Sequence, residues 1–158
     1  MRRFPTLPKA LLKPPRGFKK PKVADFQADM QRLGEDIAEE FKETLKKNIR
    51  SNKYHFQLKS ETIRKKGSRT PLIDSGEMVE SIYRNETSVS VKDTQRADSQ
   101  LTDKELFIVH EYGVKDLGIP ARPVWRNTYR DFKENAHKDV LNFLETKKFK
   151  EVRNENKD

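Results

Sequence analysis

The sequence contains no cysteine, and this absence excludes disulfides, thiolate metal sites and a cysteine nucleophile. No apolar run is long enough to span a bilayer, and no apolar segment follows the basic N-terminus. We therefore expect neither a membrane partner nor a secretory signal. Hydrophobic residues make up 33% of the 158 residues and charged residues 37%, an apolar share that is low for a globular domain. The composition predicts one modest core, with part of the chain outside it.

Signatures of common enzyme classes are also missing, because neither phosphate-binding glycine motifs nor a GxSxG nucleophile elbow occurs. The histidines, His55, His110 and His137, lack HExxH spacing, and His110–Glu111 is the only adjacent pair of a histidine and an acid. In a strand these two side chains would point to opposite faces, which suits neither a shared metal nor a proton relay. We expect a structural hydrogen-bonding role for His110, no enzymatic activity and no cofactor. An enzyme such as a nuclease or endolysin is the least favoured hypothesis, since no paired carboxylates stand in a recognisable setting.

Residues 1–22 are set apart by charge and by proline. They hold five of the eight prolines, eight of the 34 Lys and Arg residues and none of the 25 acids, so the rest of the chain has 26 basic and 25 acidic residues. Proline disfavours a helix or a central strand, so we predict an extended basic arm. Its basic residues, which can contact DNA phosphates or a partner protein, are Arg2, Arg3, Lys9, Lys13, Arg16, Lys19, Lys20 and Lys22. A tail that serves solubility or docks on an acidic neighbour remains an equal alternative.

Two long segments have apolar residues at intervals of three or four, which predicts amphipathic helices. The first follows Asp25 as far as Arg50, with Gly34 as a close-packing point, and the second begins near Pro123 and extends to Lys147. Its aromatic residues Trp125, Tyr129 and Phe132 are interpreted as core. A polar tail is predicted over 148–158.

The middle of the chain is predicted to be mixed. Residues 60–66 indicate a short helix ended by Gly67, and Asp74 or Ser75 can cap another through Met78 and Ile82. Residues 82–84 and 88–91 alternate as strands do, and 92–103 are predicted to form a loop. Residues 106–109 fit either a buried strand or a helical turn. The sequence thus predicts an α+β domain over 23–147, with two long helices packed on a small, mainly antiparallel sheet.

Several short sequence phrases follow one another in a defined order and spacing between residues 62 and 123. They are Thr62-Ile63-Arg64-Lys65-Lys66-Gly67, Pro71-Leu72-Ile73-Asp74-Ser75-Gly76-Glu77-Met78, Ser81-Ile82, Val109-His110-Glu111-Tyr112-Gly113 and Ile119-Pro120-Ala121-Arg122-Pro123. Together they resemble the phage virion morphogenesis family, which includes head–tail joining, tail-completion and neck proteins of tailed bacteriophages. The matching phrases span about two-fifths of the chain, and the basic arm lies outside them.

The resemblance implies a structural virion protein that is assembled in the host cytoplasm and located at the head–tail junction. It implies a homo-oligomeric ring of six or twelve subunits that contacts connector or head-completion proteins, tail terminator or tail tube proteins, and the DNA in the channel. The chemistry of these residues indicates that they set the fold. Gly113 permits a tight turn, and Arg122 can anchor a stiff link to a carboxylate or carbonyl. The resemblance implies that the following residues form the fold-setting family motif: Gly67, Pro71, Asp74, Ser75, Gly76, His110, Glu111, Gly113, Pro120, Arg122 and Pro123. The alternative is a non-specific nucleic-acid-binding protein that acts through the arm.

Overall fold

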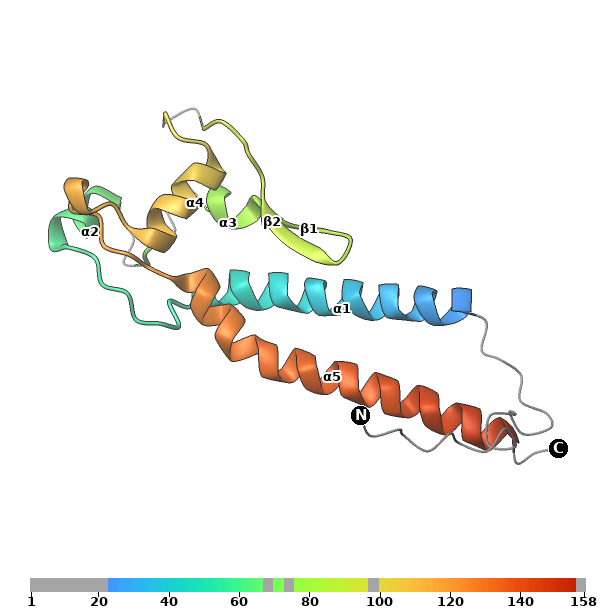
Figure 1. Ribbon diagram of the computed structural model, residues 1–158. Coiled ribbons are helices and arrows are strands. Elements are labelled where there is room, and N and C mark those ends of the chain that lie inside the picture. The colour runs from blue at the N-terminus through green and yellow to red at the C-terminus, as the bar shows by residue number, and fades with distance from the viewer. Residues whose placement is uncertain (1–22, 67–69, 73–75, 97–99, 156–158) are drawn as a thin grey trace, which may run out of the picture.

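Two long helices and a β-hairpin form the framework of the protein in the computed structural model, which describes residues 23–66, 70–72, 76–96 and 100–155 (Figure 1). In chain order the elements are α1 (Val23–Arg50), α2 (Ser60–Lys66), α3 (Glu77–Glu80), β1 (Ile82–Asn85), β2 (Ser88–Val91), α4 (Asp103–Tyr112), the 3-10 helix η2 (Lys115–Leu117) and α5 (Val124–Glu155). The long helices pack on the small antiparallel sheet, which confirms the predicted α+β class. The predicted basic arm, residues 1–22, lies outside the described residues.

Helix α1 carries the largest part of the core. Its predicted apolar stripe is confirmed, because Phe41, Leu45 and Ile49 are buried on the face that meets the rest of the domain. The helix contacts both strands of the hairpin as well as α5. Gly34 lies at a close contact between α1 and the hairpin turn, since a Cβ at this position would be 2.7 Å from the Thr87 Cγ2 atom. A larger residue at position 34 would require the Thr87 side chain, or the turn that carries it, to shift.

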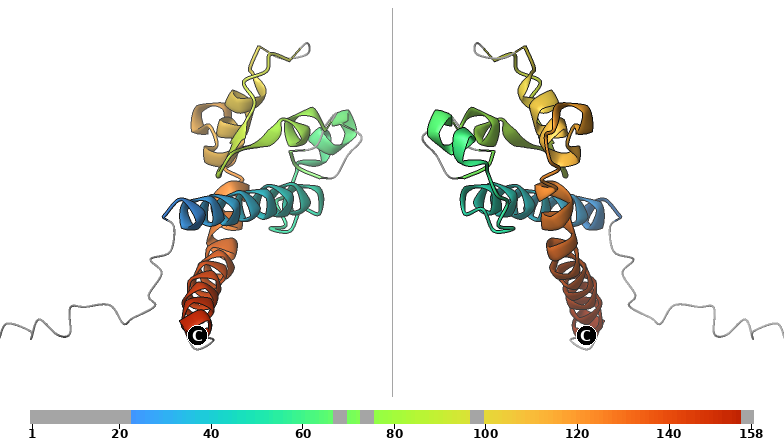
Figure 2. Two further views of the ribbon diagram at one scale, coloured as in Figure 1. Left: turned by 90° about the vertical axis from the view of Figure 1, so that its right-hand side faces the viewer. Right: turned by 90° about the vertical axis from the view of Figure 1, so that its left-hand side faces the viewer.

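The two strands form the hairpin that the alternating pattern predicts. Strand β1 pairs with β2 in antiparallel register, with Ile82 opposite Val91 and Asn85 opposite Ser88. Ile82 and Val91 are buried against α1, whereas Tyr83 on the other face is exposed. The hairpin, α3 and α4 lie on one side of α1, and most of α5 extends away on the other side (Figure 2).

Helix α5 runs antiparallel to α1 and is joined to it by aromatic contacts. The Phe41 ring lies 5.4 Å from each of the Trp125 and Phe132 rings, measured between centroids. The prediction that Tyr129 belongs to the core is wrong, because this residue is 58% exposed, although its ring lies edge-on to the Phe41 ring at 6.3 Å between centroids. Phe132 is buried, and Trp125 is partly buried, as the spacing predicts.

A polar network also joins the two long helices. Asn48 Nδ2 donates to Thr128 Oγ1 at 3.0 Å, and both residues are buried. Just beyond the end of α1, Lys53 Nζ lies 2.9 Å from Asp131 Oδ2, and the Tyr54 hydroxyl is 3.1 Å from the same oxygen. The hydrogen bond from Lys53 lowers the pKa of Asp131 below its usual value. The network therefore fixes the start of α5 against the end of α1 through specific polar contacts.

Two predicted boundaries are wrong. The C-terminal tail predicted over 148–158 is helical as far as Glu155, because the chain there is rich in good helix formers and lacks Gly and Pro. Residues 106–109, for which the sequence fits either a strand or a helical turn, belong to α4. The loop predicted over 92–103 ends one residue early, at Thr102, whose hydroxyl caps α4 by accepting from the Glu105 N–H at 3.3 Å. The predicted caps Asp74 and Ser75 lie outside the described residues, and α3 begins after Gly76 and ends at Glu80.

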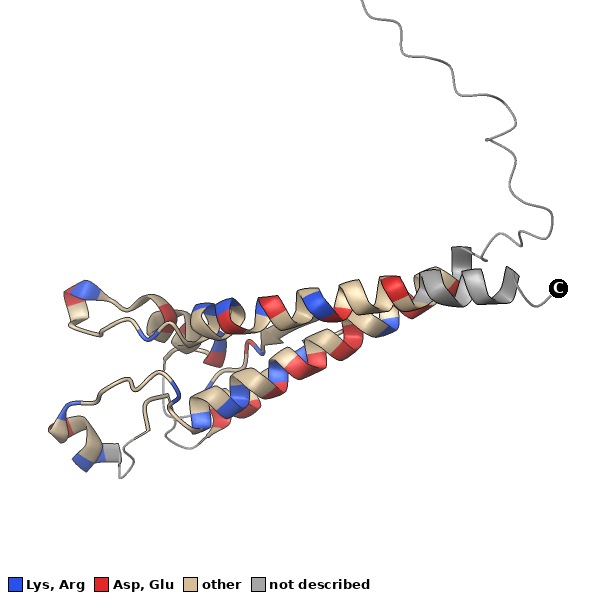
Figure 3. Ribbon diagram, turned by 90° about the horizontal axis from the view of Figure 1, so that it is seen from below, with Lys and Arg blue, Asp and Glu red and all other residues tan. Residues whose placement is uncertain are grey.

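Charges of both signs alternate along the described helices (Figure 3). Several of these charges form ion pairs between elements, such as Arg84 with Glu39 at 3.3 Å and Lys46 with Glu80 at 3.3 Å. Such exposed pairs contribute little stability individually. The mixed surface agrees with the nearly neutral composition of the chain after residue 22.

Candidate functional site

Several residues of the phrases that carry the resemblance, among them His110, Glu111 and Arg122, lie where α4 meets α5. Glu111, near the C-terminal end of α4, is 5% exposed, and its carboxylate accepts hydrogen bonds from the first turn of α5. The Trp125 N–H donates to Oε2 at 3.0 Å, and the Arg126 N–H donates to Oε1 at 3.1 Å. Arg126 Nε also donates to Oε1, at 3.0 Å, and Nη2 donates to the Glu111 carbonyl at 2.9 Å. One buried carboxylate therefore satisfies N–H groups that a helix leaves unpaired at its N-terminus.

The segment between α4 and α5 folds back on itself through two glycines. Gly113 has a φ of 73°, and a Cβ there would lie 2.6 Å from the Ala121 backbone nitrogen, so the turn requires glycine. Val114 and Ile119 form an isolated antiparallel bridge around η2, and Gly118, with a φ of 61°, ends that 3-10 helix. These turns return the chain so that residue 122 lies beside α4.

Pro123 immediately precedes the first residue of α5, as the sequence predicts. A proline is favoured at this end of a helix because its missing N–H would have no partner within the helix. Together with Pro120 it stiffens the link that places Arg122. The entry of α5 is thus set by the two prolines and by Glu111.

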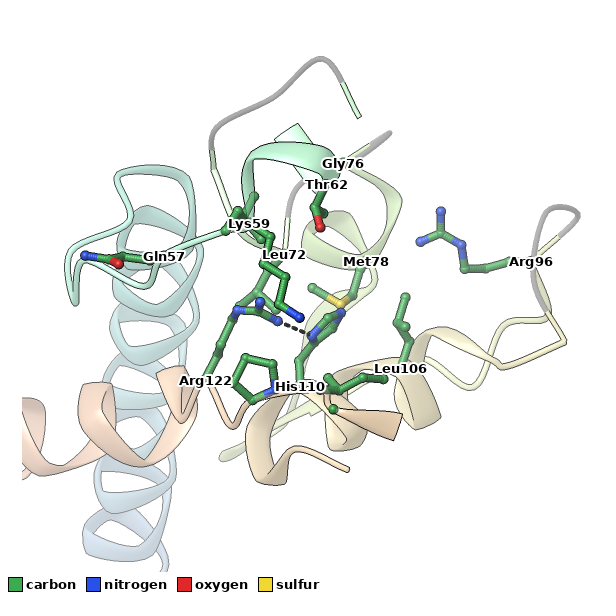
Figure 4. A pocket seen from close by; sticks show the side chains of 14 residues that line it. Gln57, Lys59, Thr62, Leu72, Gly76, Met78, Arg96, Leu106, His110 and Arg122 are labelled. Carbon is green, nitrogen blue, oxygen red and sulfur yellow. Dashed lines mark hydrogen bonds between the residues drawn. The ribbon is translucent and has the colours of Figure 1, made fainter. Parts of the chain in front are cut away.

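A cleft of about 470 Å³ opens beside this junction, between the α2–α3 region and the α4–α5 link (Figure 4). Family-phrase residues contribute Thr62, Gly76, His110, Pro120 and Arg122 to its lining. Apolar side chains form much of the wall, namely Leu72, Met78 and Ile119 from the same phrases, together with Leu58 and Leu106. Segments that are distant in sequence therefore meet around one concave surface.

Arg122 and His110 form the polar centre of the cleft. Arg122 is 8% exposed, and its Nη1 lies 3.2 Å from His110 Nδ1 (Figure 4). The backbone adds a second link, because the Arg122 N–H donates to the His110 carbonyl at 2.6 Å. Burial lowers the pKa of the Arg122 guanidinium from its ordinary value. The prediction that Arg122 binds a carboxylate or carbonyl is wrong within the described residues, where its guanidinium contacts the histidine ring.

The assumption that His110 and Glu111 lie in a strand is also wrong. On helix α4 successive side chains are about 100° apart, so His110 faces the cleft while Glu111 faces the start of α5. Sequence reasoning named Glu111 but missed its capping role, since residues 14 positions away supply the donors. It also missed Lys59 and Arg96, which line the cleft and belong to no recognised spacing.

Of the other residues predicted for the family motif between Gly67 and Gly76, the structure describes Pro71 and Gly76. Pro71 is buried, and Gly76 adopts a φ of 90° at the start of α3. Gly67, Asp74 and Ser75 lie outside the described residues, as do the eight basic residues of the arm.

Within residues 23–66, 70–72, 76–96 and 100–155, no group of three or more His, Cys, Asp or Glu side chains is placed to hold a metal ion. In the same part of the chain, no helix combines the length and apolar character needed to cross a membrane. Comparisons with models of protein families, with curated proteins and with solved structures find no match to this chain.

Proposed function

We propose that the chain is a structural virion protein of a tailed phage and forms part of the head–tail connector or neck. In this proposal it acts as a tail-completion or head–tail joining ring, most simply of six or twelve subunits. Its neighbours are the connector or head-completion proteins on one side and the tail terminator or tail tube on the other. The proposal starts from the phrases between Thr62 and Pro123, which resemble the phage virion morphogenesis family.

One observation supports this proposal most strongly. Two charged residues of the recognised phrases, Glu111 and Arg122, contact other residues of the same chain and position α4, the link and α5. These are architectural contacts, and a structural protein needs them to present surfaces in fixed orientations. An enzyme would instead need reactive groups arranged around a substrate.

Exposed apolar residues beside the junction fit assembly into a ring. Tyr112 is 65% exposed and Leu117 is 73% exposed, and Ile108 on α4 is also exposed. Arg126 lies over the Tyr112 ring, 4.9 Å from its centroid, so this aromatic side chain is held in place. Large exposed apolar side chains that cluster on one surface are typical of protein–protein contacts. We assign Ile108 and Tyr112, which are four residues apart on one face of α4, and the exposed Leu117 on η2 to the contact between subunits.

A genetic experiment tests the proposed function. In the phage or prophage that carries this gene, a nonsense allele should produce DNA-filled heads and separate tails, because joining fails while each part still assembles. Supplying the full-length chain from a plasmid should restore joined particles. A Leu117→Asp variant should complement poorly, whereas Lys138→Asp, an exposed change on α5, should complement normally. Normal infectious particles from the nonsense allele would contradict the proposal.

The second candidate, non-specific nucleic-acid binding, is favoured by the concentration of charge in residues 1–22. If the arm contacts phosphates, affinity for duplex DNA should fall steeply as salt rises, and deletion of residues 1–22 should abolish binding. Equal DNA binding by the full-length and truncated chains would reject this role for the arm.

A further inference from the structure

An apolar groove lies between α1, the β-hairpin and α5. Its floor includes Phe41 and Phe132, which are 8% and 7% exposed, and the buried Ala38. Trp125 and Tyr129 line it from α5, and Tyr129 is 58% exposed. The volume of the groove is about 480 Å³, within the usual range of pockets that enclose a ligand. Accessible Trp and Tyr side chains around an apolar floor are typical of a contact with another protein.

The two walls of the groove carry charges of opposite sign. Lys133 lines the α5 wall. On the other wall, Glu86 lies in the two-residue turn of the hairpin, next to the lining residue Thr87. Lys133 and Glu86 are exposed, and neither forms an ion pair within the described residues. The rim therefore fits an apolar ligand that brings one charge of each sign.

A rigid turn with these properties lies on η2, the short orange helix at the end of the molecule opposite to the hairpin turn (Figure 1). Leu117 on this turn is 73% exposed. The turn is closed by Val114 and Ile119, whose backbone groups exchange hydrogen bonds of 2.9 and 3.0 Å. Lys115 and Asp116 are exposed and form no ion pair within the described residues. The η2 tip, residues 115–117, thus presents one apolar side chain beside a cation and an anion.

We propose that the η2 tip of one subunit inserts into the groove of the next subunit, an inference that rests on the proposed ring. Leu117 packs on the aromatic wall and floor of the groove and leaves water. Asp116 pairs with Lys133 on the α5 wall. Lys115 pairs with Glu86 on the hairpin side, so both charges of the tip meet an opposite charge at the rim.

The separation of the tip from the groove determines the kind of assembly. Because they lie on different elements at opposite ends of the chain's fold, a subunit cannot fill its own groove with its own tip (Figure 1). Each subunit instead offers its tip to one neighbour and its groove to the other. Such a head-to-tail contact generates a closed ring when its rotation closes, whereas a contact between two identical surfaces gives a dimer.

Cysteine crosslinking of the full-length protein tests the contact, because the chain has no cysteine of its own. The double variant Lys115→Cys, Thr87→Cys places one thiol on the tip and one at the groove. A short bismaleimide should convert it into a ladder of covalent oligomers that ends at the ring size. The matched control is Lys115→Cys, Lys138→Cys, whose second thiol lies on α5 outside the described lining of the groove, and it should give no ladder.

Charge reversal assigns the partners. Asp116→Lys and Lys133→Asp each replace an attraction by a repulsion, so each should raise the concentration needed for oligomers about three- to tenfold in native mass spectrometry. The combined variant restores the pair with its polarity reversed and should return to within about twofold of the unchanged protein. Lys138→Asp, an exposed change on α5, should assemble normally.

The outcomes separate this contact from the proposed function. Oligomers without the 115–87 crosslink, a protein that stays monomeric at every concentration, or a double reversal that fails to restore assembly would each overturn the tip-in-groove contact. Purified infectious particles that contain the chain but give no crosslink would overturn the contact alone. A complete ladder from a chain that is absent from the particles would refute the proposed function and leave the contact standing.

Discussion

Replacement of Glu111 by Gln tests how the α4–α5 junction is held. The carboxylate accepts hydrogen bonds from two backbone N–H groups and from Arg126 Nε, at 3.0 to 3.1 Å. Glutamine keeps the shape and one acceptor oxygen, but it removes the charge and turns an N–H₂ group toward donors. A hydrogen bond to a charged group contributes about 1.5–3 kcal/mol, and loss of an N-cap costs about 1 kcal/mol.

The side chain of Arg126 is 55% exposed, so its share of this stabilisation is reduced by solvent. We therefore expect Glu111→Gln to lower the free energy of unfolding by about 3 kcal/mol in total, since the two backbone contacts dominate. For a chain of this length, that loss corresponds to a fall in Tm of about 6–12 °C.

Urea unfolding measures the effect with two signals. Circular dichroism follows all helices, and the fluorescence of Trp125, the single tryptophan, reports on the first turn of α5. Glu134→Gln is the matched control because Glu134 is an exposed acid on α5 without an ion pair among the described residues. A loss below about 0.5 kcal/mol for Glu111→Gln, equal to the control, would show that the carboxylate does not hold the junction.

Three further predictions concern other contacts, each read from urea or thermal unfolding. Gly113→Ala should destabilise the protein by about 2 kcal/mol, because the residue has a φ of 73° and the added Cβ would lie 2.6 Å from the Ala121 nitrogen. An unchanged unfolding midpoint would contradict this turn geometry. Thr128→Val should cost about 1–2 kcal/mol because it removes the buried acceptor of Asn48, and a neutral effect would contradict this. Asp131→Asn should destabilise at neutral pH. The pKa of Asp131 is lowered by Lys53, so the stabilisation is present above the unfolded pKa of about 4 and is lost as pH falls through the lower folded pKa. A midpoint difference between the two proteins that persists at about pH 2 would refute the assignment.

The sequence predicts the elements whose signals are local. The apolar spacing of Phe41, Leu45 and Ile49 is enough to find α1, and the alternation over 88–91 is enough to find β2. Residues 106–109 could not be assigned in this way, because a short apolar run fits a strand and a helix equally. Their helix is fixed by the Thr102–Glu105 capping box, a signal that lay just outside the apolar run.

The candidate site depends on contacts between distant positions, and this limits prediction. Glu111 and Arg126 are 15 residues apart and meet only because Gly113 and Gly118 reverse the chain. The exposure of Tyr129 illustrates the same limit, since helical spacing placed it on the core face but α1 covers only part of that face. Regular spacing identifies the face of a helix, whereas the packing partner decides how much of that face is buried.

The most direct test of the central claim is to locate the chain in assembled particles. Under the proposed function, virions of a phage that carries this gene should contain the protein at about six or twelve copies by quantitative mass spectrometry. A cryo-EM map of the isolated neck should show α1 and α5 repeated around the axis between the head and the tail. Purified infectious particles that lack the chain, or that carry it only elsewhere in the particle, would contradict the account.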